Sequence, residues 1–254
     1  MQCAVENFVK TKENGLCLID MPTGTGKTFL TGKIIGGFIR GEILQNVKTI
    51  IYLTPQKKNI DEIFNDIRRD FSDAPSLFDA NVLRIYANYE SVLDKFLDVY
   101  DRIPYAIQNR QSCKDLKKQI ELYKDLLTRN IPKDILESTV SEIRKRYEIA
   151  FRKDLSEELS KIAKNKRDRK AKINSKEYSW IKDIYPACLT EDRKVLFMTV
   201  DKFVSGNDPI ISKPYRFISH SKTKNALIFI DEFDATKDVL LNQEIQNCTD
   251  YKWI

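Results

Sequence analysis

Short apolar runs alternate with amphipathic stretches along the first hundred residues of the chain. Runs rich in aliphatic and β-branched residues predict buried strands at 16–20, 48–54 and 80–86. Apolar positions at helical spacing predict helices over 26–40, 58–71 and 89–100. In the second of these helices the residues expected on one face are Ile60, Ile63, Phe64 and Ile67. This alternation favours a largely parallel sheet with helices on both faces.

The pattern changes between 102 and about 185, where strand signals are scarce and helical spacing dominates. One apolar series is Leu116, Ile120, Tyr123 and Leu127. A longer one is Leu136, Val140, Ile143, Tyr147, Phe151, Leu155, Leu159 and Ile162. Pro132 separates them at a place suited to the first turn of the second helix. We expect a two-helix hairpin or small bundle, with this stripe as core or helix–helix seam and not a cofactor site.

Sheet character returns near the end of the chain, at 194–200 and 226–230, and a last helix is expected over 235–247. No internal repeat is found. The predicted layout is therefore an α/β body formed by 1–100 and 190–254, interrupted by a largely α-helical insertion at 101–189.

Composition excludes several classes of protein. The chain has 254 residues, 42% hydrophobic and 31% charged, which suits one large globular domain or two small ones. No run of 18 apolar residues exists, and the first residues lack the features of a secretion signal, so we expect no membrane partner. Five widely spaced cysteines without a CxxC pair argue against a disulfide framework or a structural zinc site and favour a reducing, cytoplasmic setting. The single histidine, His220, argues against a His-based metal centre or triad.

Positive charge is concentrated in the predicted insertion. Residues 101–190 hold 22 Lys and Arg against 14 Asp and Glu, whereas the whole chain has 43 against 37. Within 164–172 six of nine residues are cationic; those singled out for phosphate contact are Lys164, Lys166, Arg167, Arg169 and Lys170. Such a segment can neutralise nucleic-acid phosphates in a salt-sensitive way. A solvated helix end or surface loop is the alternative explanation.

The strongest chemical signal is the stretch DMPTGTGKTF at 20–29. Its glycines permit a tight turn around an anion at the start of a helix. The residues expected around the phosphates are Thr23, Gly24, Thr25, Gly26, Lys27 and Thr28. Lys27 would reach the β- and γ-phosphates, and the Thr28 hydroxyl would bind Mg²⁺. Met21 stands where the usual pattern has Gly or Ala. A glycine-rich turn that happens to contain GKT is the structural alternative.

A second chemical element is ALIFIDEFD at 226–234, a strand that ends in acids. Ligands of α/β sheets bind at the carboxyl ends of strands. There Asp231 would hold Mg²⁺, and Glu232 would polarise the water that attacks the γ-phosphate. A helix that begins at Asp234 would account for the acids without any chemistry. Together with the glycine-rich loop, however, they indicate nucleotide binding.

The two elements resemble motifs I and II of the first motor domain of superfamily 2 helicases and translocases, which include DEAD-box proteins and type III restriction motor subunits. LTPQ at 53–56 is similar to motif Ia, whose backbone and hydroxyl groups contact nucleic-acid phosphates. The resemblance therefore implies that Thr54 and Pro55 make such contacts. MTV at 198–200 resembles the threonine-bearing motif that also contacts these phosphates, which implies such a contact for Thr199. Gln2, 25 residues before Lys27, lies near the adenine-reading glutamine of many relatives.

The resemblance implies a RecA-like P-loop NTPase domain that binds ATP and Mg²⁺ and acts on DNA or RNA. Motifs I and II are 204 positions apart, farther than usual, and an insertion of some 85 residues at the basic helical segment would explain the excess. No clear motif III follows Asp234, and the sequence holds no second motor domain. Arginine from that domain typically contributes about 10³–10⁵ in rate. We therefore expect weak hydrolysis by this chain alone, as a fragment of a longer motor or with a partner subunit.

Three functions follow as hypotheses. The first is the ATP-binding motor domain of a nucleic-acid-dependent ATPase that translocates on or remodels DNA or RNA. The second is a P-loop ATPase of another branch that acts on protein partners. The third is a nucleotide-dependent interaction module, against which Glu232 argues because a dead site does not need it.

Overall fold

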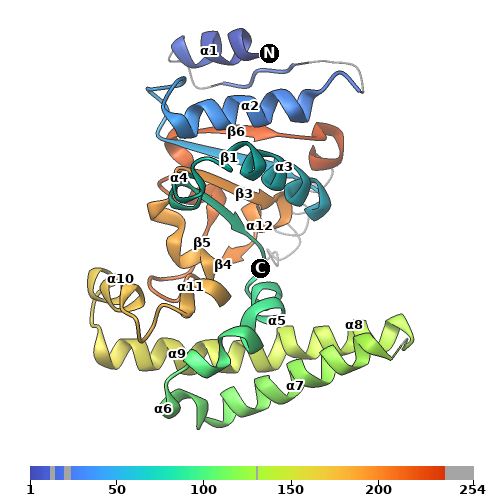
Figure 1. The fold of residues 1–254 in the computed structure, drawn as a ribbon, viewed down its shortest axis with the longest axis vertical. Coiled ribbons are helices and arrows are strands. Elements are labelled where there is room, and N and C mark those ends of the chain that lie inside the picture. Colours follow the sequence, from blue (N-terminus) through green and yellow to red (C-terminus); the bar gives the residue numbers. More distant parts are fainter. Residues whose placement is uncertain (12–14, 20–23, 130, 238–254) are drawn as a thin grey trace, which may run out of the picture. The chain divides into compact units, whose positions relative to one another are not determined.

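The computed structural model describes residues 1–11, 15–19, 24–129 and 131–237. The chain divides into two compact units (Figure 1). The first comprises Met1–Ile85, Leu189–Gly206 and Tyr215–Ile254, and the second Tyr86–Cys188 and Asn207–Pro214. The predicted insertion at 101–189 lies almost entirely in the second unit; its extent as a functional domain stays a prediction.

A parallel four-stranded sheet forms the centre of the first unit. Its strands are β1 (Thr49–Thr54), β2 (Val82–Ile85), β3 (Val195–Thr199) and β6 (Ala226–Ile230), in the order β2-β3-β1-β6. Every neighbouring pair is parallel. All six residues of β1 are buried, as a strand covered on both faces requires. The predicted α/β fold with a mostly parallel sheet is confirmed.

Helices of the first unit connect and cover these strands. They are α1 (Gln2–Lys10), α2 (Lys27–Arg40), α3 (Lys57–Asp70), α4 (Pro75–Asn81) and α12 (Val200–Val204), with short turns η4 (Phe217–Ser219) and η5 (Thr223–Asn225). The chain leaves this unit at β4 (Gly206–Asn207) and returns at β5 (Tyr215–Arg216). α2 ends where predicted, because Gly41 adopts φ 76°, the left-handed conformation that terminates helices. In α3 the predicted face is buried at Ile60, Ile63 and Ile67.

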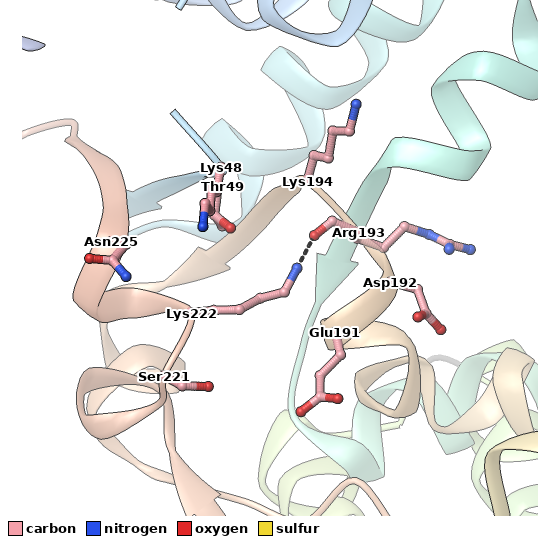
Figure 2. A pocket seen from close by; sticks show the side chains of 9 residues that line it. All are labelled: Lys48, Thr49, Glu191, Asp192, Arg193, Lys194, Ser221, Lys222 and Asn225. Carbon is pink, nitrogen blue, oxygen red and sulfur yellow. Dashed lines mark hydrogen bonds between the residues drawn. The ribbon is translucent and has the colours of Figure 1, made fainter. Parts of the chain in front are cut away.

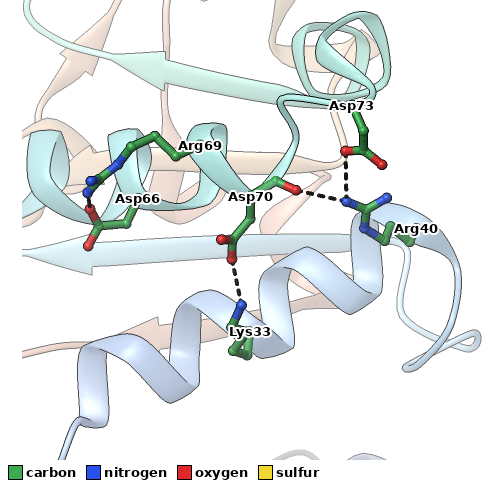
Figure 3. A network of polar contacts seen from close by, with 6 residues as sticks. All are labelled: Lys33, Arg40, Asp66, Arg69, Asp70 and Asp73. Atoms are coloured by element: carbon green, nitrogen blue, oxygen red, sulfur yellow. Dashed lines mark hydrogen bonds and ion pairs between the residues drawn. The ribbon is translucent and has the colours of Figure 1, made fainter.

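Helices α2 and α3 run in the same direction (Figure 3). A Cβ added to Gly32 would lie 3.5 Å from Ile67, and one added to Gly36 would lie 3.7 Å from Phe71, so residues 35 positions apart meet along both helices. Lys33 Nζ lies 2.8 Å from Asp70 Oδ2 and reinforces this contact. Since α3 follows β1 directly and therefore begins at the carboxyl edge of the sheet, α2 begins toward that edge as well.

Two sequence predictions are wrong in part. Residues 15–19 form no strand, and the Leu16 and Leu18 side chains are 67% and 70% exposed; Asp20 lies outside the described residues. β6 is a strand as predicted, but its residues are half-buried along its whole length. An apolar run becomes a buried strand only when another strand pairs with it, which its own pattern cannot guarantee. The predicted helix 235–247 is described only to 237, and residues 233–237 are helical.

The second unit is helical, as predicted for the insertion. Its helices are α5 (Asn88–Val99), α6 (Tyr105–Gln108), α7 (Gln111–Thr128), α8 (Lys133–Glu142), α9 (Glu148–Ile162), α10 (Lys166–Asn174) and α11 (Ile181–Ile184). A 3₁₀ turn η1 (Tyr100–Arg102) follows α5, a π turn η2 (Ile143–Tyr147) joins α8 to α9, and η3 (Pro186–Asp192) leads back toward β3. Among the helices of the described ranges, none has the length and apolar character needed to cross a membrane.

The predicted apolar stripe of this unit is buried over only part of its length. Leu116 and Ile120 of α7 are fully buried, as are Phe151, Leu155 and Leu159 of α9. Leu127 and Ile162, in contrast, are 53% and 45% exposed. Helical spacing predicted which residues share a face, but burial along that face depends on where α7 and α9 overlap.

A buried ionic cluster fastens the segment 207–214 within the second unit. Arg152 lies 2.9 Å from Glu148 and 2.7 Å from Asp208. Burial raises the pKa of Glu148 even though the guanidinium opposes the shift. Because removing one member would leave a buried charge without compensation, this cluster belongs to the folding of the unit.

Candidate functional site at the carboxyl edge of the sheet

Strand register brings several predicted residues to one edge of the sheet. Thr54 at the end of β1 is the register partner of Thr199 at the end of β3. On the other side of β1, Leu53 pairs with Ile230, and the Asp231 amide donates to the Leu53 carbonyl over 2.8 Å. Candidates from three distant stretches of the sequence therefore lie together at the carboxyl ends of adjacent strands, where α/β sheets bind ligands.

The glycine-rich loop leads into α2 at its predicted position. Gly24 and Gly26 have φ of 79° and 78°, the left-handed region that other residues adopt at a cost. Gly26 is also the N-cap of α2, so no capping side chain occupies the positive end of the helix. Lys27 is half-buried in the first turn, while Thr25 and Thr28 are exposed. Thr23 lies outside the described residues.

The Asp231 carboxylate is held on both oxygens. Tyr52, buried in β1, donates its hydroxyl to Asp231 Oδ2 over 2.6 Å, and the Glu232 amide donates to Oδ1 over 3.1 Å. Burial, followed by the hydrogen bond to Asp231, raises the pKa of Tyr52 far above its usual value. The phenol therefore stays protonated and remains a donor. Sequence analysis missed Tyr52. The feature that could have revealed it is its hydroxyl group, a polar group in the otherwise apolar centre of β1.

Glu232 occupies an unusual backbone conformation. Its φ is 52°, in the left-handed region, which costs a non-glycine residue about 1–2 kcal/mol. Its side chain accepts a hydrogen bond from Asn59 Nδ2 of α3 over 3.0 Å. Strain of this kind clusters at functional sites, where surrounding contacts maintain it. Asn59 is a second residue that sequence analysis missed, because nothing in its local pattern shows that it faces an acid 173 positions away.

The residues present fit a magnesium nucleotide. Asp231 and Thr28 offer a carboxylate and a hydroxyl, the oxygen ligands that Mg²⁺ prefers. The glycine conformations and the uncapped start of α2 suit a phosphate chain. Among the described residues, no atom lies within 4 Å of a Cβ added to Gly24.

The candidates for nucleic-acid contact differ in accessibility. Thr54 is completely buried, and Pro55 is half-buried. Thr199 is half-buried, and its hydroxyl accepts a hydrogen bond from the Lys202 amide over 3.2 Å, which caps α12. A nucleic acid at these strand ends would therefore contact backbone groups and the start of α3 more readily than the Thr54 and Thr199 hydroxyls.

Gln2 belongs to α1 of the first unit, and the basic segment belongs to the second unit. Gln2 is exposed on α1, where its amide donates to Glu6 over 2.9 Å. In the second unit, Lys164, Lys166 and Arg167 are exposed before and in the first turn of α10, and Lys170 is half-buried. Arg169 instead bonds to the Ala163 carbonyl and the Ser160 hydroxyl, so it holds α10 against the end of α9.

A hollow of the first unit lies at the opposite, amino edge of the sheet (Figure 2). It has a volume of about 340 Å³ and is lined by Lys48, Thr49, Glu191, Asp192, Arg193, Lys194, Ser221, Lys222 and Asn225. Lys222 extends toward the Arg193 carbonyl and donates to it, whereas the Arg193 and Lys194 side chains point away (Figure 2). None of the predicted site residues lines this hollow.

Comparison with known families gives a match over most of the chain. A family model described as an AAA domain, AAA_11, covers residues 2–203, about four fifths of the chain. The family comprises P-loop, helicase-like domains of the superfamily 1 type. The match supports the helicase-like character of the chain but not specifically the DEAD-like superfamily 2. The matched range contains the glycine-rich loop, Thr54 and Thr199, and it ends before Asp231. No curated protein matches the sequence.

Proposed function

The chain belongs to the AAA_11 family of P-loop, helicase-like ATPase domains, and from that premise we propose that it is the ATP-binding motor domain of a nucleic-acid-dependent ATPase. In this proposal it uses MgATP hydrolysis to translocate on, or remodel, DNA or RNA. The observation that carries the proposal is the meeting of the β1, β3 and β6 ends at one edge, with Asp231 and Glu232 beside them and α2 beginning toward the same edge.

Each residue of this edge has a proposed role. Bound MgATP supplies a reactive γ-phosphate whose charge Mg²⁺ partly neutralises. Lys27 holds the β- and γ-phosphates, supported by the amides from Thr23 to Thr28, and Thr28 and Asp231 hold the metal. Glu232 orients and deprotonates the attacking water. Gln2 contacts the base.

The nucleic-acid part of the proposal rests on two surfaces. The first is the end of β1 and the start of α3, which includes Thr54 and Pro55; Thr199 is beside it in register. The second is the group of cationic residues just before and within α10, namely Lys164, Lys166, Arg167, Arg169 and Lys170. The proposed MgATP site uses the same residues whether the chain is of the superfamily 1 or the superfamily 2 type, so the proposal does not depend on the choice between them.

A complete motor in this proposal needs a second motor domain, or a partner subunit, that supplies arginine to the γ-phosphate. We also propose a cytoplasmic location, which suits the free thiols of Cys3, Cys17 and Cys113.

The proposal is tested by nucleotide binding and by ATP turnover with and without polynucleotide. Wild-type chain should bind a fluorescent ATP analogue with Mg²⁺ and hydrolyse ATP faster when single- or double-stranded DNA or RNA is added. Turnover stimulated by a protein and indifferent to every polynucleotide would contradict it and favour the branch that acts on proteins. Binding without any turnover, even with a second domain supplied, would favour an interaction module.

Salt dependence tests the α10 surface. Replacing Lys164 and Arg167 by Ala should lower the slope of log K against log salt by about 1 for each phosphate that the protein no longer neutralises. The matched control replaces the exposed Lys133 and Lys176 of the same unit. Equal slopes in the two double variants would remove α10 from the proposed interface.

A further inference from the structure

A wide helical turn carries three adjacent cations in the second unit. The π turn η2 joins α8 to α9 within one continuous helix, and the Glu148 amide donates to the Ile143 carbonyl five residues earlier. Because a π turn holds more residues than an α-helical turn, consecutive side chains diverge less around the helix axis. Arg144, Lys145 and Arg146 therefore extend over a narrower arc than they would in an α-helix. These three residues are called the π-turn triad below.

The charge of the π-turn triad is not neutralised within the described part of the chain. All three residues are exposed, and no described residue forms an ion pair or a hydrogen bond with their charged groups. Of the acids nearest in sequence, Glu148 is buried and paired with Arg152, and Glu142 is exposed. The turn is therefore a concentrated patch of positive charge.

Two tyrosine rings restrain the arginines of the triad. The Arg144 guanidinium carbon lies 5.3 Å from the centroid of the Tyr89 ring of α5. The Arg146 guanidinium carbon lies 5.3 Å from the centroid of the Tyr147 ring. Such a contact restrains a long side chain, while the N–H donors in the guanidinium plane can still bind an anion. Side chains that are already restrained lose less entropy when they bind a ligand.

The cations around α10 are engaged to a greater extent. Arg169 donates to the Ala163 carbonyl and to the Ser160 hydroxyl. Lys166 and Lys170 each have an interaction partner as well. A phosphate that binds these residues competes with existing contacts, whereas at the π-turn triad it breaks no ion pair with a described residue.

We propose that the π-turn triad is a polynucleotide-binding site of the second unit. Arg144 and Arg146 bind backbone phosphates through their paired N–H donors, the arrangement that matches a phosphate, and Lys145 adds a third charge. A polynucleotide matches the triad better than an acidic protein segment does, because every nucleotide carries a negative charge. Phosphate contacts carry no sequence information, so the site holds the strand without reading its bases. This inference rests on the proposed function, because a nucleic-acid-dependent ATPase has to hold a polynucleotide.

Salt dependence of oligonucleotide binding by the 254-residue chain tests the site. The test variant is Arg144→Ala/Lys145→Ala/Arg146→Ala, and the probes are labelled oligo-dT and oligo-U. Each phosphate neutralised on a single strand contributes about 0.7 to the slope of log K against log salt. Loss of three contacts should therefore lower the slope by about 2.

A charge-matched control separates the triad from net charge. It replaces three exposed lysines of the same unit by Ala: Lys133, Lys176 and Lys213. This control should bind with the slope of the wild type. Equal slopes in the control and the triad variant would overturn the proposal.

A charge-preserving variant and a competitor test the chemistry of the site. Arg144→Lys/Arg146→Lys keeps the charges but loses paired N–H donors, so it should keep the wild-type slope and bind about fivefold more weakly for each hydrogen bond lost. A retained slope also shows that substitution at this turn leaves the unit folded. Displacement of the oligonucleotide by polyglutamate at equal charge concentration would overturn the assignment to a polynucleotide in favour of an acidic protein.

ATP turnover distinguishes this inference from the proposed function. If polynucleotide stimulates wild-type turnover while the triad variant binds like the control, the site is wrong and the proposed function stands. If only the triad variant loses salt-dependent binding while wild-type turnover is indifferent to every polynucleotide, the proposed function is wrong and the binding site stands.

Discussion

The two edges of the central sheet carry different kinds of polar residues. At the amino edge, charged side chains surround a hollow of about 340 Å³, and Lys222 is engaged by a backbone carbonyl. At the carboxyl edge, Tyr52, Asn59, Asp231 and Glu232 are joined to one another in pairs by side-chain hydrogen bonds. A hollow lined by charged side chains marks the amino edge, whereas paired side-chain hydrogen bonds mark the carboxyl edge.

A hollow and a binding site are therefore separate properties of a fold. Strand starts and strand ends are both crowded with loops, so cavities form at either edge. Only at the carboxyl edge do helices begin rather than end, and their first amides favour anions. The proposed phosphate-binding site is therefore at the carboxyl edge, whereas this hollow is at the other edge.

Lys27→Ala is the change that should affect the carboxyl edge most. Loss of the ammonium group removes the charge that faces the β- and γ-phosphates, and kcat/KM for ATP should fall by about 10³, the upper range for one preorganised donor. Steady-state ATP hydrolysis and fluorescent nucleotide titration measure it. Lys33→Ala on the same helix loses an exposed ion pair with Asp70 and a cation–π contact with Phe29, and it should retain nucleotide binding. Equal behaviour of the two variants would refute the assigned role of the loop.

Glu232→Gln should separate binding from turnover. The amide cannot accept the proton of the attacking water, so kcat should fall by about 10² while nucleotide affinity changes little. Glu191→Gln at the amino edge is the control and should leave kcat unaltered, since Glu191 lines the hollow of that edge. The comparison between edges fails if the Glu191 variant loses as much activity as the Glu232 variant.

Tyr52→Phe should have a smaller effect on the metal side of the site. The change removes the 2.6 Å hydrogen bond to Asp231 but keeps the buried ring, and one hydrogen bond is worth about 1 kcal/mol. The Mg²⁺ concentration for half-maximal turnover should change about fivefold. Tyr105→Phe, on an exposed tyrosine, serves as control. An unchanged Mg²⁺ dependence would mean that Asp231 is positioned by the backbone alone.

Lys222→Met should have the smallest effect. It removes a charge and a hydrogen bond from the amino-edge hollow, so thermal stability should fall slightly, while ATP affinity stays within about twofold of wild type. Calorimetry and nucleotide titration on one preparation measure both. A large loss of ATP affinity in this variant would show that the two edges are not independent.

Much of the fold was predictable from local patterns. The periodicity of 26–40 and 58–71 matches α2 and α3 to within one residue, and the apolar runs 48–54 and 226–230 match β1 and β6. The predicted strand at 16–20 is wrong. Its residues are as apolar as those of β1, but a strand forms only where a neighbouring strand pairs with it. Tyr52 and Asn59 were not predictable, since their partners lie 179 and 173 positions away.

Local sequence was enough for most of the secondary structure, for the two left-handed glycines and for the acids that follow an apolar strand. It was also enough for the helical, basic nature of the middle segment. These depend on backbone preferences and on residues within a few positions of one another. Tertiary structure alone decided that Thr54 faces inward, that Tyr52 holds Asp231 and that Asn59 holds Glu232. Those contacts follow from strand order and register, which bring distant segments within hydrogen-bonding distance and which no local pattern encodes.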